Sequence, residues 1–251
     1  MRNQMLVVGI NSVRSALRFG VDGVSELWLD RRRRDRRLLE LATLARDAGI
    51  AVKQLDRDAL DQAAEGTNHQ GAMAWVKKPG ARAEQGLDEL LVGMNGPPFL
   101  LILDGVTDPH NLGACLRSAD AAGVHAVIAP KDNAVGLTPV AVKVASGAAE
   151  SVPFIQVTNL ARTLDQLKSL GIWLIGTADD TQTTLYQTDL RGPLALVLGG
   201  EGKGMRRLTR ERCDLLVRLP MLGRVESLNV SVAAGVCLYE GLRQRMPTPS
   251  A

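Results

Sequence analysis

Short apolar runs that alternate with helical patterns fill the chain from residue 99 onward, and they constrain its fold more than any other feature. Each run has the length of one buried strand, and apolar residues recur at helical spacing in most of the stretches between. Strands that are apolar on both faces and separated by helices are typical of a mostly parallel sheet covered on both sides. The predicted strands are Phe99–Leu103, His125–Ala129, Val152–Val157, Ile172–Gly176, Leu194–Leu198 and Leu215–Leu219. The predicted helices are Asn111–Ala122, Thr138–Ala145, Asn159–Ser169, Gly204–Arg212 and a last one from Asn229 to about Gln244.

The first 77 residues predict a separate, small α/β/α domain. Its strands are Leu6–Ile10, Val24–Leu29, Ala51–Leu55 and Gly71–Val76, and its helices are Ser12–Phe19, Arg36–Ala48 and about Asp58–Ala64. Residues 78–97 carry several Gly and Pro and little periodicity, which is typical of a linker with one helical turn. We therefore expect three parts, 1–77, 78–97 and 98–251, of which the last binds its ligand beyond the carboxyl ends of its strands.

The composition excludes several classes of protein. With 45% apolar and 23% charged residues, the chain is close to a soluble globular average and is neither collagen-like, coiled-coil nor disordered. It has no apolar run near the roughly 20 residues that span a bilayer, and no signal peptide is apparent. Its three cysteines have no metal-ligand spacing, so we expect no metal, packed thiols and a reducing compartment, the cytoplasm.

An arginine run stands at the end of a predicted strand, where residues 31–37 hold six arginines. Residues 1–77 carry 13 Lys and Arg against 10 Asp and Glu, so the excess of positive charge lies in this first third. Guanidinium groups suit bidentate contacts with phosphate, so the run favours nucleic-acid binding without sequence specificity. A solvated helix start is the alternative explanation.

A second polar feature precedes the strand at Gly71. Thr67, Asn68, His69 and Gln70 place four hydrogen-bonding side chains in a row, and such a loop could contact base edges or sugar hydroxyls. A turn in which these side chains only cap the backbone is equally compatible with the sequence.

The loop after the strand Phe99–Leu103 leads into a helix, and active-site groups gather in such loops. Asn111 is a candidate N-cap, and Arg117 points away from the apolar face of that helix. Capping alone for Asn111, and a surface charge for Arg117, remain open at this point.

A glycine-rich loop, residues 199–204, follows the strand Leu194–Leu198. It lacks the Gly-Lys-Ser/Thr of a phosphate-binding loop and the glycine spacing of a dinucleotide fingerprint. Its four glycines around Glu201 favour close backbone approach to a ligand, with a strained left-handed turn as the alternative. Further along, Ser227 and Asn229 can cap the last helix and also face the carboxyl edge of the sheet.

Taken together, three blocks resemble the SpoU family of RNA ribose 2′-O-methyltransferases, within the SPOUT superfamily. The blocks are Asn111-x-Gly113-x-x-x-Arg117, Gly199-x-Glu201-x-x-Gly204 and Ser227-Leu228-Asn229-Val230-Ser231. Residues 1–77 resemble the family's substrate-binding domain of ribosomal-protein-L30e type. The resemblance implies a deep trefoil knot in the C-terminal part, which pattern reasoning would not reach because knots are nearly absent from proteins.

The resemblance also implies the activity and the site. The implied methyl donor is S-adenosylmethionine, held by Gly199, Leu219 and Leu228, and the implied assembly is a homodimer with no membrane partner. The expected acceptor is a guanosine ribose of 23S ribosomal RNA, with transfer RNA as the alternative substrate. The implied catalytic residues are Asn111, Arg117, Glu201, Ser227 and Asn229. The implied RNA-binding residues are Arg31, Arg32, Arg33, Arg34, Arg36, Arg37, Asn68, His69 and Gln70.

Arginine is a poor base because its pKa exceeds about 12, so we expect Arg117 to bind the neighbouring phosphate and stabilise the developing oxyanion. Two other classes of protein compete with this reading. A non-catalytic RNA-binding protein would need only the first domain, and the five polar residues of the implied site argue against it. A nicotinamide-dependent dehydrogenase is disfavoured by the glycine spacing.

Overall fold

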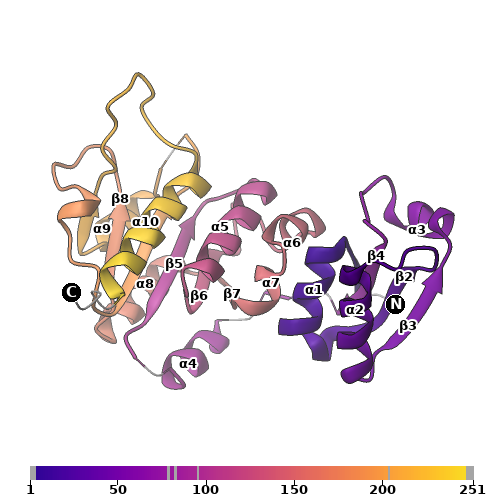
Figure 1. Ribbon diagram of the computed structural model, residues 1–251. Coiled ribbons are helices and arrows are strands. Elements are labelled where there is room, and N and C mark those ends of the chain that lie inside the picture. Colours follow the sequence, from indigo (N-terminus) through magenta and orange to yellow (C-terminus); the bar gives the residue numbers. More distant parts are fainter. Residues whose placement is uncertain (1–3, 78–79, 82–83, 95, 203, 247–251) are drawn as a thin grey trace, which may run out of the picture. The chain divides into compact units, whose positions relative to one another are not determined.

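The computed structural model describes residues 4–77, 80–81, 84–94, 96–202 and 204–246. The chain divides into two compact units, the first formed by 1–80 with 142–151 and the second by 81–141 with 152–251 (Figure 1). The strands are β1 (Gln4–Val8), β2 (Val24–Asp30), β3 (Ala51–Leu55), β4 (Ala72–Lys77), β5 (Phe99–Asp104), β6 (Ala126–Pro130), β7 (Phe154–Val157), β8 (Trp173–Thr177), β9 (Leu194–Gly199) and β10 (Leu215–Val217). The helices are α1 (Ile10–Phe19), α2 (Arg36–Asp47), α3 (Arg57–Ala64), α4 (Gln85–Val92), α5 (Pro109–Ala121), α6 (Pro139–Ala145), α7 (Ala148–Ser151), α8 (Leu160–Ser169), α9 (Arg207–Arg212) and α10 (Val230–Arg245), with short 3-10 turns at Val21–Gly23 and Leu185–Gln187.

The first unit contains a four-stranded sheet in the order β1-β4-β2-β3. β4 runs antiparallel to both β1 and β2, whereas β2 and β3 are parallel. Because successive residues of a strand point to opposite faces, Ala72 and Ala74 of β4 pack with α1 and α2, while Met73 packs with α3. The sheet therefore carries helices on both faces, which confirms the predicted α/β/α arrangement.

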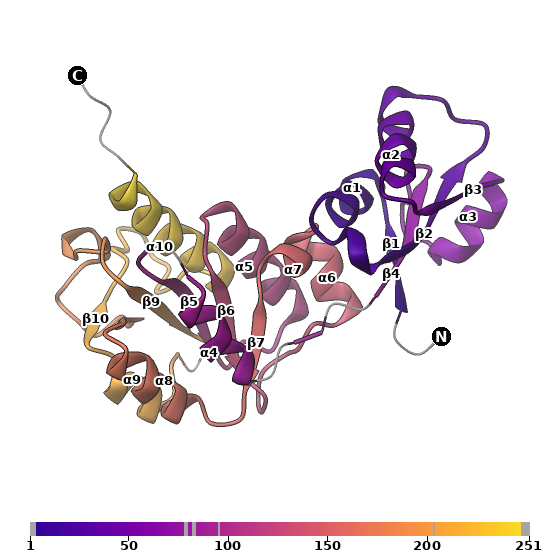
Figure 2. The same cartoon turned by 90° about the horizontal axis from the view of Figure 1, so that it is seen from below.

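The second unit contains a six-stranded sheet in the order β10-β8-β9-β5-β6-β7, and every neighbouring pair is parallel. Helices α5 and α10 cover one face, and α4, α8 and α9 cover the other (Figure 2). All six residues of β5 are buried, as expected for a central strand between two helix layers. Each fully buried Leu or Ile contributes roughly 1.5–3 kcal/mol of burial free energy. The predicted parallel, doubly covered sheet is confirmed, and the trefoil knot stays a prediction.

Several boundaries differ from the sequence prediction. The last predicted helix before β10 begins at Arg207 instead of Gly204, because residues 204–206 continue the preceding loop. In the expected linker, α4 has eight residues instead of one turn, and Leu87 is only 1% exposed within the core of the second unit. The amphipathic spacing of 87–91 therefore reflects real packing. Residues 78–79, 82–83 and 95 of the predicted linker lie outside the described residues.

The three cysteines are unpaired, and burial raises the pKa of each thiol to about 12, so all three remain protonated and unreactive at neutral pH. This agrees with the expected packed thiols. Across the described ranges, every helix is too short or too polar to cross a membrane.

Candidate active site

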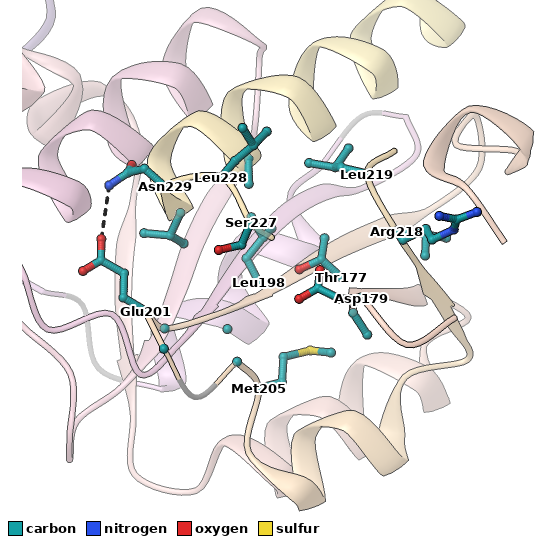
Figure 3. Close-up of a pocket in the computed structure, with 18 of the residues that line it drawn as sticks. Thr177, Asp179, Leu198, Glu201, Met205, Arg218, Leu219, Ser227, Leu228 and Asn229 are labelled. Carbon is teal, nitrogen blue, oxygen red and sulfur yellow. Dashed lines mark hydrogen bonds between the residues drawn. The ribbon is translucent and has the colours of Figure 1, made fainter. Parts of the chain in front are cut away.

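A cavity of about 620 Å³ lies at the carboxyl ends of β8, β9 and β10 (Figure 3). Its walls are formed by the loops that follow these strands and by the start of α10. Open parallel sheets generally bind ligands beyond the carboxyl ends of their strands, and the cavity has this position.

The glycine-rich loop after β9 is shaped by contacts within the protein. A Cβ at Gly199 would lie 2.1 Å from the carbonyl carbon of Gly204, and one at Gly200 would lie 2.2 Å from the carbonyl oxygen of Gly105. Gly202 and Gly204 have φ angles of 77° and 63°, in the left-handed region. The folding of the loop therefore requires these glycines in the absence of any ligand. The close approach of a ligand to the backbone stays a prediction.

A buried carboxylate holds the end of this loop. Asp104, the last residue of β5, has a side chain that is 0% exposed. One carboxylate oxygen accepts a hydrogen bond from the backbone N–H of Arg206 at 2.8 Å, and the other accepts from its Nε at 2.6 Å. The carbonyl of Asp104 also accepts from Gly200 N–H at 2.8 Å. Both ends of the loop are thus fixed to the same strand terminus, which is why α9 starts only after Arg206.

Three polar side chains from separate segments meet at one end of the cavity. The Glu201 carboxylate accepts from Asn111 Nδ2 and, at 3.1 Å, from Asn229 Nδ2. Asn229 Nδ2 also lies 3.1 Å from the Asn111 side-chain oxygen, which accepts from it. Figure 3 places the Asn229–Glu201 pair at one end of the cavity, with Arg218 and Asp179 towards the other. The three sequence blocks therefore converge, as expected from the resemblance.

Of the three predicted caps, Asn229 caps its helix, whereas Asn111 and Ser227 do not. α5 is capped by Asp108, whose carboxylate accepts from His110 N–H at 2.8 Å, and Pro109 occupies the first helical position. Asn111 is inside the first turn and buried, so its prediction as N-cap is wrong, and its amide is available to Glu201. Asn229 does cap α10, because its side-chain oxygen accepts from Ser231 N–H at 2.9 Å. Its amide nitrogen remains free for Glu201.

The other end of the cavity was not predicted. Asp179 and Asp180 follow β8, and Arg218 follows β10. Arg210 donates to both carboxylate oxygens of Asp180, at 2.7 and 2.8 Å, and this contact lowers the pKa of Asp180 below its usual value. Only their position in the sequence could have indicated them, since Asp179 and Asp180 come three and four residues after the strand end expected at Gly176.

Most of the predicted catalytic and donor-binding residues line this cavity. Gly199, Leu219 and Leu228 are in its wall, as are Glu201, Ser227 and Asn229. Asn111 reaches the site through its hydrogen bond to Glu201. Arg117 does not line the cavity. It is exposed on α5, and no hydrogen bond or ion pair holds it within the described part of the chain.

The predicted RNA-binding residues lie in the first unit. Within the arginine run, Arg31 and Arg32 pair with Asp56, and Arg33 pairs with Asp35. The other three arginines of the run, Arg34, Arg36 and Arg37, are exposed and have no ion pair among the described residues. Three arginines of the run are therefore held in ion pairs, and the other three have none among the described residues.

The residues of the second predicted RNA-contact segment, 67–70, also differ in their exposure and hydrogen bonding. Asn68 and Gln70 are exposed, whereas His69 is buried and both of its ring nitrogens make hydrogen bonds.

In the described ranges, no three His, Cys, Asp or Glu side chains gather as metal ligands would.

Comparison with known proteins adds to this geometry. Residues 98–239 match the SpoU rRNA Methylase family, and residues 6–81 match a family described as RNA 2′-O ribose methyltransferase substrate binding. Proteins named 23S rRNA (guanosine-2′-O-)-methyltransferase RlmB are similar over nearly the whole chain. The one from Ralstonia nicotianae is 54% identical (100% of both chains), and the one from Shewanella oneidensis is 56% identical (98% of this chain, 99% of the other).

Solved structures are similar as well. The SpoU methyltransferase AviRb from Streptomyces viridochromogenes, in complex with the cofactor AdoMet, has a TM-score of 0.78 at 27% identity, over 97% of this chain and 91% of the other. The match to the family model spans more than half of the chain and includes every residue of the convergent polar cluster. The chain therefore belongs to the SpoU rRNA methylase family.

Proposed function

We propose that this protein transfers a methyl group from S-adenosylmethionine to the ribose 2′-hydroxyl of a guanosine in 23S ribosomal RNA. The observation that carries the proposal is the meeting of Asn111, Glu201 and Asn229 at one end of the cavity after β9. The reaction and the RNA are those named for the full-length relatives, which are 54% and 56% identical. No observation favours a transfer-RNA substrate.

The cavity suits the methyl donor in size and chemistry. Its volume of about 620 Å³ lies within the range of small-molecule sites, roughly 300–1,000 Å³. Leu219 and Leu228 offer apolar surface for a purine, and the Gly199 backbone can be approached closely. Asp179 and Thr177 offer acceptors for hydroxyl and ammonium groups. When bound, S-adenosylmethionine supplies a methyl carbon attached to a positively charged sulfur.

The chain's own residues would position the ribose. Two amide donors fix the Glu201 carboxylate, and each amide is oriented by a further contact, so the cluster is preorganised before RNA arrives. A site that is fixed in advance lowers the barrier mainly through orientation. Glu201 Oε1 takes both of these hydrogen bonds, which leaves Oε2 as the oxygen able to accept from a substrate hydroxyl. Ser227 would complete the polar wall.

A second copy of the chain would complete the site. Arg117 is exposed, unpaired among the described residues and outside the cavity wall. Apolar side chains are exposed on the loop after β10 and on α10, including Leu222 at 98%, Val232 and Tyr239. Burial of such a surface is the expected driving force for a homodimer. In that dimer, Arg117 of one protomer would bind the phosphate of RNA held at the other protomer's cavity.

The first unit would bind the RNA. We assign residues 1–77 to RNA binding and 98–251 to catalysis, in keeping with the two family matches, while α4 of the expected linker packs into the core of the second unit. Arg34, Arg36 and Arg37 have no ion pair among the described residues and suit phosphate contacts, which fix position without reading sequence. Three free, protonated thiols fit work in the cytoplasm.

Methylation of defined RNA tests the proposal. The purified protein is incubated with labelled S-adenosylmethionine and 23S ribosomal RNA from cells that lack this protein, and ribose methylation is mapped. We expect one methylated guanosine, and loss of the product with Arg117→Ala or Glu201→Gln. A protein that binds the RNA but not S-adenosylmethionine would be a non-catalytic RNA-binding protein, and the proposal would be wrong.

Mixed dimers test the shared site. A dimer of one Arg117→Ala chain and one Glu201→Gln chain keeps one intact site if Arg117 acts on the partner's cavity. Random mixing of equal amounts should then restore roughly a quarter of wild-type activity, because half of the dimers are mixed and each holds one intact site. If the mixture is as inactive as the separate variants, the two residues belong to the same protomer's site.

A further inference from the structure

A second cavity, of about 540 Å³, lies in the first unit and shares no lining residue with the cavity described above. Its wall includes Arg33 and Arg37 at the start of α2, Arg57 on α3, and Asn68 and Gln70 in the loop before β4. The cavity is far larger than a single phosphate group needs, and it combines guanidinium groups with side-chain amides.

A fixed loop forms one wall of this second cavity. Glu65, Gly66, Gln70 and Gly71 all have positive φ angles, between 46° and 85°. His69 locks this conformation. Its Nδ1 accepts from Gly71 N–H at 3.0 Å, so the proton of the neutral ring is on Nε2, which lies 2.9 Å from Asp61 Oδ1. With both nitrogens engaged and the side chain 7% exposed, His69 shapes the loop.

The loop presents hydrogen-bond donors. Asn68 Oδ1 accepts from Gln70 N–H at 3.2 Å, and Gln70 Oε1 lies 3.4 Å from Ile10 N, a weak contact. The Gln70 carbonyl accepts from Arg33 Nη1 at 2.7 Å. Both amide oxygens and the nearby carbonyl are therefore occupied, whereas the two side-chain NH₂ groups have no partner within the described residues.

The acidic groups of the cavity are already engaged. Asp61 contacts His69 and lies 3.7 Å from Arg57 Nε, and Asp30 accepts from Arg32 N–H at 2.9 Å. Arg37 has no ion pair among the described residues. A ligand of this cavity must therefore bring acceptors of its own, including at least one anionic group.

We infer that this cavity receives one unstacked guanosine nucleotide of the RNA, with its phosphate on Arg37 and Arg57 and its base on the amide groups of Asn68 and Gln70. The N7 and O6 atoms of guanine are adjacent acceptors, and they match two N–H donors. Adenine has an amino group in place of O6 and would set donor against donor. Specific RNA recognition generally uses such unstacked bases. The inference rests on the proposed function, which supplies RNA as the substrate, and it names a contact that the first unit makes with the RNA.

Nucleotide titration of the full-length protein tests the inference. The side-chain amide signals of Asn68 and Gln70 are followed by NMR while 5′-GMP, 5′-AMP or inorganic phosphate is added. We expect 5′-GMP to shift both amide pairs and to bind roughly tenfold more tightly than 5′-AMP, the size of one lost bidentate base contact. Inorganic phosphate should shift only arginine signals. Equal responses to 5′-GMP and 5′-AMP, or amide shifts caused by phosphate alone, would overturn the inference.

Near-isosteric variants sharpen the test. Asn68→Asp keeps the oxygen that accepts from Gln70 N–H but replaces the donor NH₂, so the loop is retained while guanine affinity falls roughly tenfold. Gln70→Glu makes the same change at the second donor. Gln62→Glu, at an exposed position of α3 outside the cavity wall, adds an equal charge and should change little. Loss of 5′-GMP affinity in Gln62→Glu equal to that in Asn68→Asp would mean that charge alone is responsible.

Separate measurements distinguish this inference from the proposed function. S-Adenosylmethionine affinity and 23S ribosomal RNA methylation are measured on the wild type. If the wild type methylates the RNA but its second cavity does not prefer guanine, only the guanosine site is wrong. If 5′-GMP binds as expected but no methylation occurs, the proposed function fails and the nucleotide site remains.

Discussion

Asp104→Asn is the substitution that tests most directly how the glycine-rich loop is held. In the wild type, two N–H groups of Arg206, one from the backbone and one from the guanidinium, each donate to one oxygen of Asp104. Asparagine has nearly the same shape but offers one oxygen and one NH₂ group. One Arg206 donor must then face another donor inside a region where the side chain at position 104 has no access to water.

The magnitude follows from these contacts. A hydrogen bond to a charged group is worth roughly 1.5–3 kcal/mol, and an unsatisfied buried donor adds a further desolvation cost. The side chain of Arg206 is 47% exposed, so water screens part of the ionic attraction. We therefore expect a loss of about 3 kcal/mol in the free energy of unfolding, equivalent to roughly 6–12 °C in Tm for a chain of this size. Because the same loop carries Glu201, S-adenosylmethionine affinity should fall as well.

Differential scanning calorimetry of the full chain measures this effect. Asp189→Asn provides the control, because Asp189 makes a similar two-point contact with Arg191, yet both side chains are exposed. Exposed pairs contribute little, so the control should melt with the wild type. If Asp104→Asn melts within about a degree of the wild type, the buried clamp does not stabilise the loop, and the reasoning is refuted.

Three further predictions concern Glu150, the arginine run and Gly199. Burial raises the pKa of Glu150 from 4.5 to about 7, so wild-type stability should decline as the pH rises from 4.5 through 7. Glu150→Gln should remove this decline and be more stable than the wild type by up to about 3 kcal/mol at about pH 8, as measured by urea unfolding at several pH values. Replacing Arg34, Arg36 and Arg37 together by Gln should weaken RNA binding and reduce the slope of log affinity against log salt by about 2–3, measured by filter binding. Gly199→Ala should abolish S-adenosylmethionine binding in a calorimetric titration, because its methyl group would lie 2.1 Å from the Gly204 carbonyl carbon.

Each of these predictions has a contrary outcome. A Glu150→Gln variant with the pH profile of the wild type would show that another group titrates. An unchanged salt slope in the triple arginine variant would show that these arginines do not contact the RNA phosphates. As a control, S-adenosylmethionine affinity should be unaffected in that variant. Gly192→Ala is the match for Gly199→Ala, because nothing lies within 4 Å of the added methyl group. If the two alanine variants bind S-adenosylmethionine equally, the loop tolerates the displacement.

Local patterns were sufficient for the layered fold. The apolar runs Phe99–Leu103 and Leu194–Leu198 became the neighbouring central strands β5 and β9, since a continuous apolar stretch is stable only between two covered faces. The amphipathic stretch near Leu87 was underrated because its neighbours Gly and Pro suggested a linker. Its burial depends on contact with α8, which is distant in the sequence. The local periodicity of apolar residues does not reveal such a partner.

The sequence predicted those site residues whose type and local context suggest few roles other than ligand binding. It did not predict contacts between side chains that are far apart in the sequence. Glu201 among glycines and the Ser227–Asn229 block pointed to the cavity that they line. The pairing of Asp104 with Arg206 joins residues 102 positions apart in the sequence, and spacing carries no trace of it. Asn111 was mistaken for a cap because Asp108, three residues earlier, satisfies the same preference and is followed by Pro109.

Asn229 has a consequence for how this enzyme would respond to heat. Its oxygen caps the final helix, while its nitrogen donates to the Glu201 carboxylate, which we propose faces the ribose. Fraying of that first helical turn therefore removes one of the two amide donors that hold the carboxylate, so turnover would be lost a few degrees before the rest of the protein melts. Thermal inactivation and global denaturation would then be two separable events, and residues that strengthen the helix start would extend the working temperature without touching the substrate.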